Sequence, residues 1–495
     1  MHDVIIVGAG HNSLVAGIFL ARAGMKVTIY EHAATPGGAV ATEEVTLPGF
    51  RHDLFSAGHV RFAGSPAYAA LGPELEARGL KYLVQEPSFG TLLDARRGAW
   101  ISSNLDETLA QFGRHSPADA RAWAAQYALF RRAIPFLGRL FSMPQPSYAT
   151  ARTLWQAWRT LGRREFMEIG ESFFATAHEW SARHFESEAL RALFVPWPCH
   201  GDMAPDDAGG ALPCLLAGGL GQTRGQLVPE GGSGRLAEAL AKLYTDLGGE
   251  LHCAQPVTRI LRRNGRAQGV EVDGRDIEAR RAVIASTHPG LTARLLGDVT
   301  GPAALPAIGT MVIHLALEGP IAWHAGEHYQ RAGYLHLNAD TDTLRLAYAN
   351  ALSGRMPEAP LVVWGQPSAV DATRAPAGRH TAWLMVRAMP MRGIDWDAQK
   401  EATANRVIAG LERYGPIRQR VLARTVCSPL DLIRRNPSLG GVVPRPLHAS
   451  LVRSLPPRLR YTTPTRGLYQ IGAGTFPGPG LSGTSGMLLA QRLLR

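Results

Sequence analysis

The start of the chain carries the pattern that most constrains the fold. The apolar run Val4–Val7 predicts a short buried strand, and Gly8-Ala9-Gly10 follows it directly. Apolar residues then recur at helical spacing as far as Gly24, and Val27–Tyr30 predicts a second strand that ends at Glu31. A strand, a glycine turn, a helix, a strand and an acid, in this order, predict the βαβ unit that binds a dinucleotide.

Each residue type in this unit has a chemical reason. Gly8 permits the tight turn, and Gly10 lets the backbone approach a pyrophosphate. The helix that begins near Asn12 offers free N–H groups and the positive end of its dipole to that anion. Glu31 lies 21 positions after Gly10, where it can accept hydrogen bonds from ribose hydroxyls. Ser13 replaces the usual third glycine, and the pattern alone does not separate NAD from FAD.

Composition narrows the class of partner. The 495 residues, 45% hydrophobic and 19% charged, suffice for two or more globular domains. The net charge of +11 comes almost entirely from arginine, because lysine occurs only at positions 26, 81, 242 and 400. The arginines are scattered and form no long basic run, so we expect no nucleic-acid partner. A basic face that meets anionic lipid is kept as a minor alternative.

The cysteines and the ends of the chain bear on its compartment. The four cysteines form no CxxC pair and have no metal-binding spacing, so we expect a reducing compartment and no metal. Met1-His2-Asp3 leads directly into the first strand, which leaves no room for a signal peptide, and no apolar stretch approaches the length of a membrane span. We expect a cytoplasmic protein, with peripheral attachment to a membrane left open.

A second glycine pair lies shortly after Glu31, in Pro36-Gly37-Gly38-Ala39. It is compatible with a plain turn, but flavoproteins of the amine-oxidase and phytoene-desaturase kind place a Gly-Gly here, close to the flavin, and this chain resembles them. The resemblance implies that Phe50–His59 runs beside the isoalloxazine ring. His52 and His59 are therefore the candidate catalytic residues, with a purely structural role as the alternative for each.

The residues from 66 to about 214 predict a helical region. Helical spacing extends from Asp106 to Phe141 and from Ala149 to Leu193. Its many aromatic residues form the core of this region, line a hydrophobic substrate tunnel, or make a membrane-docking face. The segment Phe194–His200, with two prolines, predicts a rigid non-helical loop beside the cavity, and Trp197 is a candidate for the substrate pocket.

The middle of the chain is rich in glycine between Gly218 and Leu236. No Gly-Lys-Ser/Thr follows, which excludes a P-loop. The pattern Pro-x-Gly-Gly-x-Gly-x-Leu at 229–236, followed by a helix to Leu247 and a strand, resembles the middle FAD segment of the same superfamily. In that segment the residue matching Val257 holds adenine by its backbone. Further strands are expected at Val257–Arg262, Ala267–Val272 and Ala282–Ala285.

A second sheet is expected between about 290 and 435. Its predicted strands are Thr310–Leu317, Leu344–Ala349, Leu361–Gly365 and Thr381–Arg387, and Ala398–Tyr414 predicts an amphipathic helix. In the superfamily that the chain resembles, such a sheet floors the substrate cavity.

The C-terminal segment is the third glycine-rich signal. A strand ends in Gly472-Ala473-Gly474, and a glycine-lined turn leads to a final helix that ends near Leu494. The turn and the N-terminus of this helix can hold a pyrophosphate. The segment resembles the GAGTHPGGGVSGxxG signature of phytoene-desaturase-like proteins. It departs from that signature at Phe476, where histidine is usual, and at Pro479. Phe476 adds an apolar wall near the ring, and a histidine role there does not carry over.

Three signals in the right order identify the chain as a member of the phytoene-desaturase-like FAD-dependent oxidoreductases by resemblance. The resemblance implies an α/β fold: a Rossmann-like FAD-binding domain of the amine-oxidase type (1–65, 215–290 and 440–495) and a second α+β substrate domain (66–214 and 291–439). The cofactor-binding residues that it implies are Gly8, Gly10, His11, Asn12, Ser13, Glu31, His32, Gly37, Gly38, Ala39, Val257, Gly474, Gly483 and Thr484.

The resemblance also implies the chemistry. The chain has no second βαβ fingerprint and no redox CxxC, which argues against routine reduction by NAD(P)H. We expect a hydride to pass from a hydrophobic small molecule to non-covalently held FAD, and electrons to leave to oxygen, a quinone or another acceptor. A redox-neutral polyene isomerase or saturase and a flavin-binding protein without turnover are the alternatives. The substrate and the oligomeric state are left open.

Overall fold

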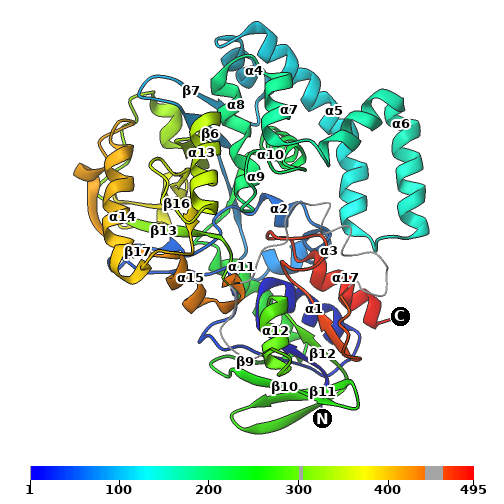
Figure 1. Cartoon of the computed structure of the whole chain (residues 1–495). Helices are drawn as coiled ribbons and strands as arrows, with labels where there is room; N and C mark the ends of the chain where they lie inside the picture. Colours follow the sequence, from blue (N-terminus) through cyan, green and yellow to red (C-terminus); the bar gives the residue numbers. More distant parts are fainter. Residues whose placement is uncertain (1, 300–304, 441–460) are drawn as a thin grey trace.

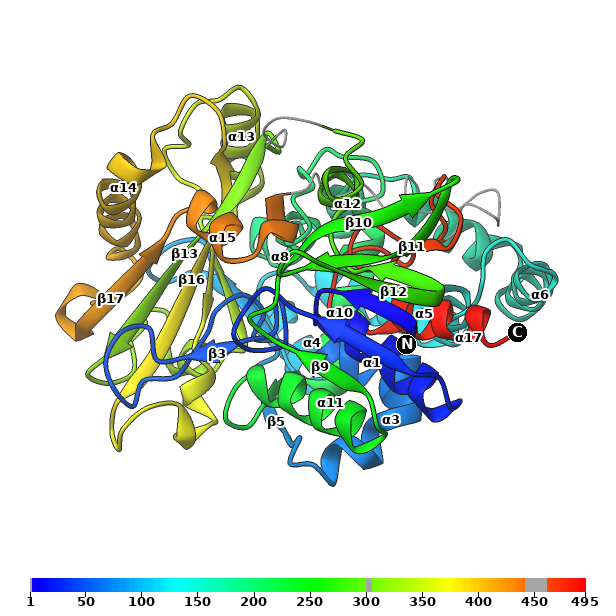
Figure 2. The same cartoon turned by 90° about the horizontal axis from the view of Figure 1, so that it is seen from below.

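The computed structural model describes residues 2–299, 305–440 and 461–495. Figure 1 shows three regions: a sheet with the chain's first and last helices beside it, a second sheet flanked by α14 (Trp396–Leu411), and a group of helices that begins with α4 (Leu105–Gly113). Figure 2 shows the same regions from below, with the first sheet in front. No helix in the described ranges is both long enough and apolar enough to cross a bilayer.

The first sheet contains both parallel and antiparallel strands. Its order is β10-β11-β12-β1-β2-β9, with β18 beside β12. The first residues of β12 pair antiparallel with β11, and Ala279–Ala285 pair parallel with β1, so one long strand joins the two parts. The strands are β1 (His2–Val7), β2 (Val27–Tyr30), β9 (Glu250–His252), β10 (Val257–Arg263), β11 (Arg266–Val272), β12 (Arg275–Ala285) and β18 (Leu468–Gln470).

Successive side chains of β1 point to opposite faces of this sheet, and each face carries a hydrophobic core. Val4 and Ile6 belong to the core beneath the helices, whereas Ile5 and Val7 pack against the β10–β11 side. The covering helices are α1 (His11–Arg22), α3 (Pro66–Glu76), α11 (Gly234–Asp246) and α17 (Thr484–Leu493). Helix α3 packs against α11 and α17. The domain boundaries stay a prediction. Residues 441–460 of the predicted third segment lie outside the described residues.

The second sheet has the order β17-β13-β16-β15-β14-β6-β7 and is antiparallel except between β14 and β6. Helix α14 covers one face, where it packs on Ile313, Leu335 and Leu384. The predicted strands near 310, 361 and 381 and the helix near 398 are confirmed. The strands are β6 (Phe89–Leu92), β7 (Gly98–Ile101), β13 (Ile308–Leu317), β14 (Tyr334–Leu337), β15 (Val362–Gly365), β16 (His380–Pro390) and β17 (Val421–Cys427).

Two local predictions are wrong. Leu344–Ala349 is not a strand but part of α13 (Thr341–Leu352), because Asp340 caps the helix at the backbone N–H of Thr343 and the apolar residues follow helical spacing. The segment after α8 (Glu188–Phe194) is not a non-helical loop: Pro196–Cys199 forms the single-turn α9. Proline is tolerated in a first helical turn, where its missing N–H has no intrahelical partner to lose.

The helical region confirms the expected helical character of the chain between 105 and 194. Its longest members are α5 (Pro117–Ser142) and α6 (Tyr148–Ser172), and α10 (Ala211–Arg224) packs against α5. A Cβ on Gly219 of α10 would lie 2.3 Å from the Phe130 ring, so the glycines of α10 admit aromatic rings at close range. The remaining elements are β3 (Thr42–Glu43), β4 (His52–Asp53), α2 (Val60–Ala63), β5 (Tyr82–Gln85), α7 (Ala177–His184), β8 (Gln226–Pro229), α12 (Pro289–Leu295), α15 (Pro429–Arg435) and the 3-10 turns η1 (Glu327–Gln330), η2 (Pro367–Ala369), η3 (Ala372–Arg374), η4 (Arg418–Arg420) and η5 (Pro437–Gly440).

A buried ion pair links the β3–β4 hairpin to the 3-10 turn η3, which lies between β15 and β16 of the second sheet. The guanidinium of Arg374 contacts Asp53 of β4 at 2.7 Å, and both side chains are almost fully buried. The same carboxylate accepts the backbone N–H of Ser233 at 2.8 Å and the hydroxyl of Thr42 at 2.6 Å. One carboxylate therefore ties the turn before α11, the β3–β4 hairpin and the second region together.

We expect Arg374→Met to lower the free energy of unfolding by about 3–5 kcal/mol, because it leaves the Asp53 charge buried without its partner. Urea unfolding at neutral pH measures the change. The matched control is Arg379→Met, which breaks a largely exposed contact with Glu318 and should cost less than about 1 kcal/mol. Equal losses in the two variants would contradict this role for the buried pair.

Candidate active site

Backbone hydrogen bonds fix the conformation of the turn after β1. The N–H of Gly8, whose φ is +90°, donates to the carbonyl of Tyr30 at 2.8 Å. Gly10 forms an isolated bridge with Gly37, and the N–H of Gly37 donates to the carbonyl of Ala9 at 2.9 Å. The two glycine pairs predicted near the flavin therefore lie side by side, and a Cβ on Gly38 would come within 3.3 Å of the Gly10 Cα.

The C-terminal glycine segment meets this turn. Ser485 donates its hydroxyl to the side-chain oxygen of Asn12 at 2.9 Å and accepts the N–H of Gly472 at 3.1 Å. Ser286, at the end of β12, lies 3.8–3.9 Å from the positions that a Cβ would take on Gly8, Gly10 or Gly472. Three segments far apart in the sequence thus surround one space at the ends of the parallel strands.

The middle glycine segment approaches the same turn from the side. A Cβ on Gly37 would lie 3.0 Å from the Cβ of Ala237 in α11. The N–H of Gly234 donates to the hydroxyl of Thr42 at 2.9 Å, and a Cβ on Gly232 would lie 2.4 Å from that same hydroxyl. All three glycine-rich segments that the sequence singled out are therefore neighbours in the fold.

The acid at the end of β2 is buried beside the glycine turn. The Glu31 carboxylate accepts the N–H of Ala9 at 2.6 Å and that of Ala33 at 2.8 Å, and it contacts the His32 ring at 2.6 Å. Burial alone would raise its pKa, but the hydrogen bonds from His32 and the two amides hold the pKa below its usual value. The N–H of Gln255 donates to the backbone carbonyl of Glu31, which brings the start of β10 at Val257 to this acid.

The other predicted cofactor residues are distributed around this space. His11 is next to the Asn12 amide, and burial lowers its pKa to about 4. Ser13 is fully buried, and its hydroxyl has no hydrogen-bond partner within the described ranges. Gly483 has a φ of +70° and precedes the buried Thr484, the first residue of α17. A Cβ on Gly474 would lie 3.0 Å from Pro289.

These residues fit a flavin nucleotide. The glycines at 8, 10 and 472 leave backbone accessible where a Cβ would otherwise stand, and α1 and α17 both begin at the same space. Helix N-termini and glycine backbone suit a pyrophosphate, and a buried acid after β2 suits ribose hydroxyls. The assignment of individual residues to the cofactor stays a prediction.

The second sheet turns one face toward this unit. Register places the side chains of Phe89, Tyr334, Trp383, His314 and Thr425 in one row across six strands, with Gly365 of β15 between Tyr334 and Trp383. A parallel row contains Thr91, His336, Val363, Met385 and Val312. This is the face opposite α14. We call it the inner face of the second sheet.

Aromatic rings and histidines gather at one end of the inner face. The Trp197 ring lies 4.7 Å from Phe89, 4.8 Å from His200 and 5.4 Å from His336, measured between ring centroids. The Nε2 atoms of His200 and His336 are 2.9 Å apart. The predicted pocket residue Trp197 therefore does lie against the inner face, on the single-turn helix α9.

The segment that the resemblance places beside the flavin ring contacts the inner face. A Cβ on Gly58 would lie 2.4 Å from the Tyr334 hydroxyl, and Ala57 packs with Val363 and Trp383. His52 of β4 lies edge-on to His314 of β13, with their ring centroids 5.2 Å apart. The predicted flavin-side segment and the sheet therefore face each other.

The two predicted catalytic histidines are in different environments. His59 is fully buried, and both ring nitrogens are engaged, with the Tyr82 hydroxyl at 3.2 Å and the Ser233 hydroxyl at 3.0 Å. His52 uses Nε2 to contact the Thr46 hydroxyl at 2.8 Å, while its Nδ1 has no partner among the described residues. Both ring nitrogens of His59 are thus engaged within the fold, whereas one ring nitrogen of His52 is not engaged in the part of the chain that the structure describes, and a catalytic role for either residue stays a prediction.

Phe476 is separate from Trp197. It is buried in the core of the nucleotide-binding unit, where its ring centroid lies 6.5 Å from that of Phe141, and its carbonyl accepts the Tyr461 hydroxyl at 2.9 Å. Trp197 packs instead on the core of the helical region. The two predicted pocket residues are therefore not brought together in one cluster.

Burial keeps the histidines of the site neutral. It lowers the pKa of His336 to about 3, of His314 to about 4 and of His52 to about 2, and it lowers that of His200 well below 6.5. The nearby carboxylates are paired: Asp53 with Arg374 and Asp202 with Arg387, the latter at 2.6 Å. The inner face therefore offers aromatic surface and neutral imidazoles, and its charged side chain Arg387 is paired with Asp202.

Sequence reasoning missed most of this face. Five residues of this face were not predicted as site residues from the sequence: His314, His336, Tyr334, Trp383 and Arg387. A signal was present for two of them, because His314 and His336 are single polar residues inside the apolar runs of β13 and β14. Which side of the sheet would face the flavin depends on tertiary packing, which the pattern of a single strand does not give.

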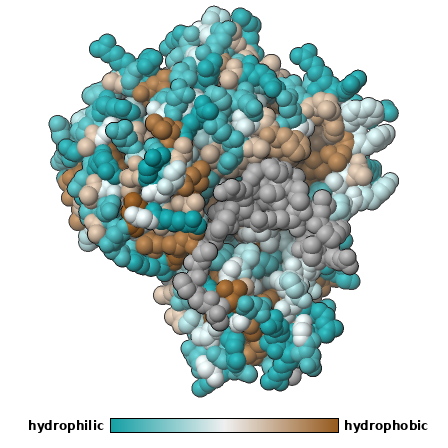
Figure 3. All heavy atoms as spheres, in the orientation of Figure 1, coloured by the Kyte–Doolittle hydropathy of each residue, from teal (hydrophilic) through white to brown (hydrophobic). Residues whose placement is uncertain are grey.

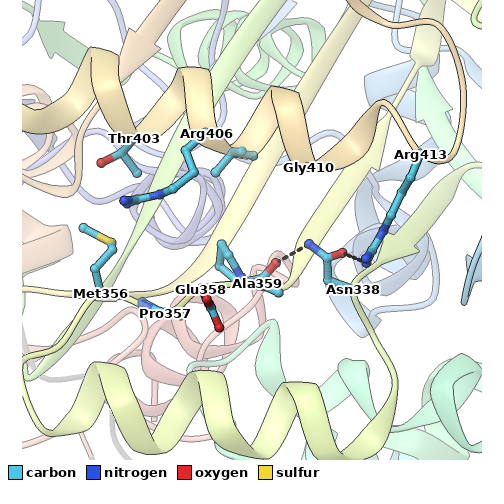
Figure 4. A pocket seen from close by; sticks show the side chains of 11 residues that line it. Asn338, Met356, Pro357, Glu358, Ala359, Thr403, Arg406, Gly410 and Arg413 are labelled. Carbon is cyan, nitrogen blue, oxygen red and sulfur yellow. Dashed lines mark hydrogen bonds between the residues drawn. The ribbon is translucent and has the colours of Figure 1, made fainter.

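A separate pocket of about 170 Å³ lies on the other side of the second sheet, between α14 and residues 356–360. Figure 4 shows Arg406 of α14, Arg413 and Glu358 around it, with the Asn338 amide between the Pro360 carbonyl and Arg413. None of the predicted cofactor or catalytic residues lines this pocket.

Comparison with known proteins agrees with this arrangement. The model of the flavin containing amine oxidoreductase family matches residues 96–420, and that of the NAD(P)-binding Rossmann-like domain matches residues 6–69. The chain is 28% identical to pyridine nucleotide-disulfide oxidoreductase domain-containing protein 2 of Rattus norvegicus, over all of this chain and 93% of that protein.

Two further likenesses cover nearly the whole chain. A hydroxyneurosporene desaturase of Cereibacter sphaeroides is 28% identical, over 99% of this chain and 97% of its own. The crystal structure of an oxidoreductase from Methanosarcina mazei superposes with a TM-score of 0.62 at 16% identity, over 99% of each chain, which shows a shared fold.

Gly10→Ala separates cofactor binding from folding. Gly10 has a φ of −66°, and an added Cβ would meet nothing closer than the Ser286 hydroxyl at 3.9 Å, so the fold should tolerate it. The methyl group would stand where the pyrophosphate approaches, so flavin affinity should fall by at least about tenfold. Flavin content after gel filtration and far-UV circular dichroism measure the two effects.

The control is Gly24→Ala, at a φ of +80° with open space around it. It should lower thermal stability slightly and leave flavin content unchanged. Full flavin retention in Gly10→Ala would contradict the proposed cradle.

His314→Phe tests the buried neutral histidine. The folded protein keeps His314 unprotonated far below 6.5, where the unfolded chain binds a proton, so wild-type stability should fall as the pH drops below 6.5. Relative to the wild type, the variant should therefore be about 2 kcal/mol more stable at about pH 5 than at about pH 8. Urea unfolding at the two pH values measures the difference, and an identical difference at both would contradict a buried, uncharged ring.

Proposed function

Because the chain belongs to the flavin containing amine oxidoreductase family and is a phytoene-desaturase-like flavin-dependent oxidoreductase, we propose that it dehydrogenates an uncharged, hydrophobic small molecule at a carbon–carbon bond. We further propose that the flavin is FAD, held without a covalent bond. The observation that carries the proposal is the inner face of the second sheet, which is aromatic and neutral and lies against residues 52–58.

The proposed cradle assigns a task to each glycine-rich segment. The turn at Gly8 and Gly10 and the N-terminus of α17 take the pyrophosphate, and Glu31 takes the ribose of the adenosine half. Bound FAD supplies a hydride acceptor at its ring. The protein's own contribution is to orient the substrate C–H bond toward that ring and to exclude water.

The low pKa of the buried histidines on the inner face favours carbon–carbon oxidation over base-assisted oxidation in this proposal. Removing a proton from an alcohol or ammonium group calls for a base whose pKa lies near the working pH. His336, with a pKa of about 3, and His314, at about 4, are poor bases for that task. They suit an apolar substrate, beside which they present uncharged rings.

The proton that leaves the neighbouring carbon needs an acceptor on the same face. Both ring nitrogens of His314 and the Nδ1 atoms of His52 and His336 have no hydrogen-bond partner in the described part of the chain. We assign the proton to His314, because it stands opposite Trp383 in the register of β13 and β16 and faces His52. A C–H bond next to a carbon that has given up hydride is strongly acidic, so an imidazole of low pKa suffices as its acceptor. His52 remains in the site as its neighbour, and His59 positions Ser233.

Anaerobic mixing with uncharged hydrophobic substrates tests the proposal. The visible absorbance of the oxidised flavin should be lost in step with the formation of one new carbon–carbon double bond, and oxygen or a quinone should restore it. Denaturation should release the FAD from the polypeptide. Bleaching by charged amines alone would overturn the proposal, and turnover that needs prereduced flavin without net electron transfer would establish the isomerase or saturase alternative.

Trp383→Leu should raise KM for such a substrate by about tenfold or more, because it removes aromatic surface from the inner face. Trp323→Leu is the matched control. It removes a buried indole from the opposite face, where Trp323 packs edge-on against Trp364 at 5.2 Å, and it should leave KM unchanged. Steady-state kinetics at one pH measure both, and equal KM values in the two variants would contradict the inner face as the substrate wall.

A further inference from the structure

The first part of α6 is packed on only one side. Its buried residues, Thr153, Ala157 and Leu161, recur every four positions, and α6 packs against α5. Tyr148, Arg152, Trp155 and Arg159 recur at intervals of four, three and four residues and form the stripe on the opposite side of the helix. Both views place this first part of α6 at the edge of the molecule, beside α5 (Figures 1 and 2), whereas the part after the kink at Gly162 packs on the core of the helical region.

Large apolar and aromatic side chains are exposed on this free side. Tyr148 is 86% exposed, Trp155 56%, Trp158 48% and Leu154 41%. Figure 3 shows pale and brown residues among teal ones on this side of the molecule. A helix that only bounds a soluble protein has polar and charged residues on its outer side, so two exposed tryptophans with a tyrosine and a leucine require another explanation.

Positive charge predominates around these residues, and the next acidic residue along the chain, Glu165, pairs with Arg132. Between positions 120 and 164 the chain has eight arginines and no Asp or Glu: Arg121, Arg131, Arg132, Arg139, Arg152, Arg159, Arg163 and Arg164. Within the described ranges no ion pair involves any of the four on α6, and the Arg159 guanidinium lies 5.4 Å from the Trp155 ring. Helix α6 is interrupted by the non-helical Gly162, and the exposed Arg163 and Arg164 follow directly after this kink. We call these two arginines, together with Tyr148, Arg152, Leu154, Trp155, Trp158 and Arg159, the outer face of α6.

We propose that the outer face of α6 docks the protein on a membrane surface rich in anionic phospholipid. Tryptophan and tyrosine favour the level of the lipid headgroups, and arginine is attracted to the negative charge of that surface. A second copy of this chain fits less well, because a symmetric contact would bring two sets of the same arginines together. Leu154 and Trp158, which flank the arginine stripe, supply the apolar surface that enters the lipid.

Sedimentation with vesicles tests the proposal on the full-length, flavin-loaded protein. The wild type should bind vesicles that contain phosphatidylglycerol and bind far less to pure phosphatidylcholine, and added salt should weaken the binding. Trp155→Ser with Trp158→Ser should reduce binding by about tenfold or more. Replacing the four arginines of α6 by glutamine should reduce it by on the order of 100-fold.

Matched controls lie elsewhere on the surface. Leu346→Ser changes a residue of α13 that is 60% exposed, and the four-arginine control is Arg263, Arg275, Arg281 and Arg392 to glutamine. Both controls should bind vesicles like the wild type, and all variants should keep their flavin and their melting temperature. Quenching of tryptophan fluorescence by brominated lipid should be lost in the Trp155 and Trp158 variant.

Three results would overturn the proposal. The first is a wild type that binds neither kind of vesicle, and the second is binding that the α6 variants do not change more than the controls. The third is a different partner for the same residues: a dimer in lipid-free solution that the tryptophan substitutions dissociate, or tight binding of nucleic acid that the arginine substitutions abolish.

Discussion

The close backbone contact between α1 and α17 is the constraint on which the rest of the structure depends. A Cβ on Gly486 would lie 2.0 Å from the Asn12 carbonyl oxygen, so this contact exists only because residue 486 is glycine. Beside it, Ser485 bonds to Asn12, 473 positions away in the sequence. Two helices from opposite ends of the chain thus begin at one space, and the N–H groups and dipoles of both act on whatever anion is bound there.

Residues 42–59 connect the glycine turns of the cradle to the second sheet and so set where that sheet lies. Residues 42–59 leave the cradle, pair in the β3–β4 hairpin, and meet the second sheet at His314, Tyr334 and Trp383. Asp53 holds this segment by accepting bonds from Ser233 and Thr42 and pairing with Arg374. The cradle and the inner face are therefore fixed relative to each other by one buried carboxylate.

The packing of the two sheets leaves the candidate site without net charge. Its histidines are packed among rings and strands, so the cost of desolvating a charge keeps them unprotonated. The acids that could have charged the site are already paired with arginines. A neutral aromatic wall beside the proposed flavin cradle fits the substrate class that we propose, which binds by its apolar surface.

The sequence predicted the elements whose chemistry is local. The glycine turn, the buried acid at Glu31, the strands of both sheets near 257–285 and 308–317, and the final helix follow from motifs and periodicity. Two predictions failed because neighbouring residues override the local sequence pattern. Leu344–Ala349 alternates like a strand, but Asp340 caps it as part of a helix. Pro196 starts a helical turn, although proline was expected to prevent one. The inner face was missed because its histidines and tryptophan lie on different strands, which only the register brings into one row.

A crystal structure of the protein purified with its own flavin tests the proposed cradle most directly. We expect density for the pyrophosphate between Gly10, Ser286 and Gly472, with the ring system between residues 52–58 and the Trp383–His314 row. A flavin bound elsewhere, or with its ring turned away from the inner face of the second sheet, would contradict it.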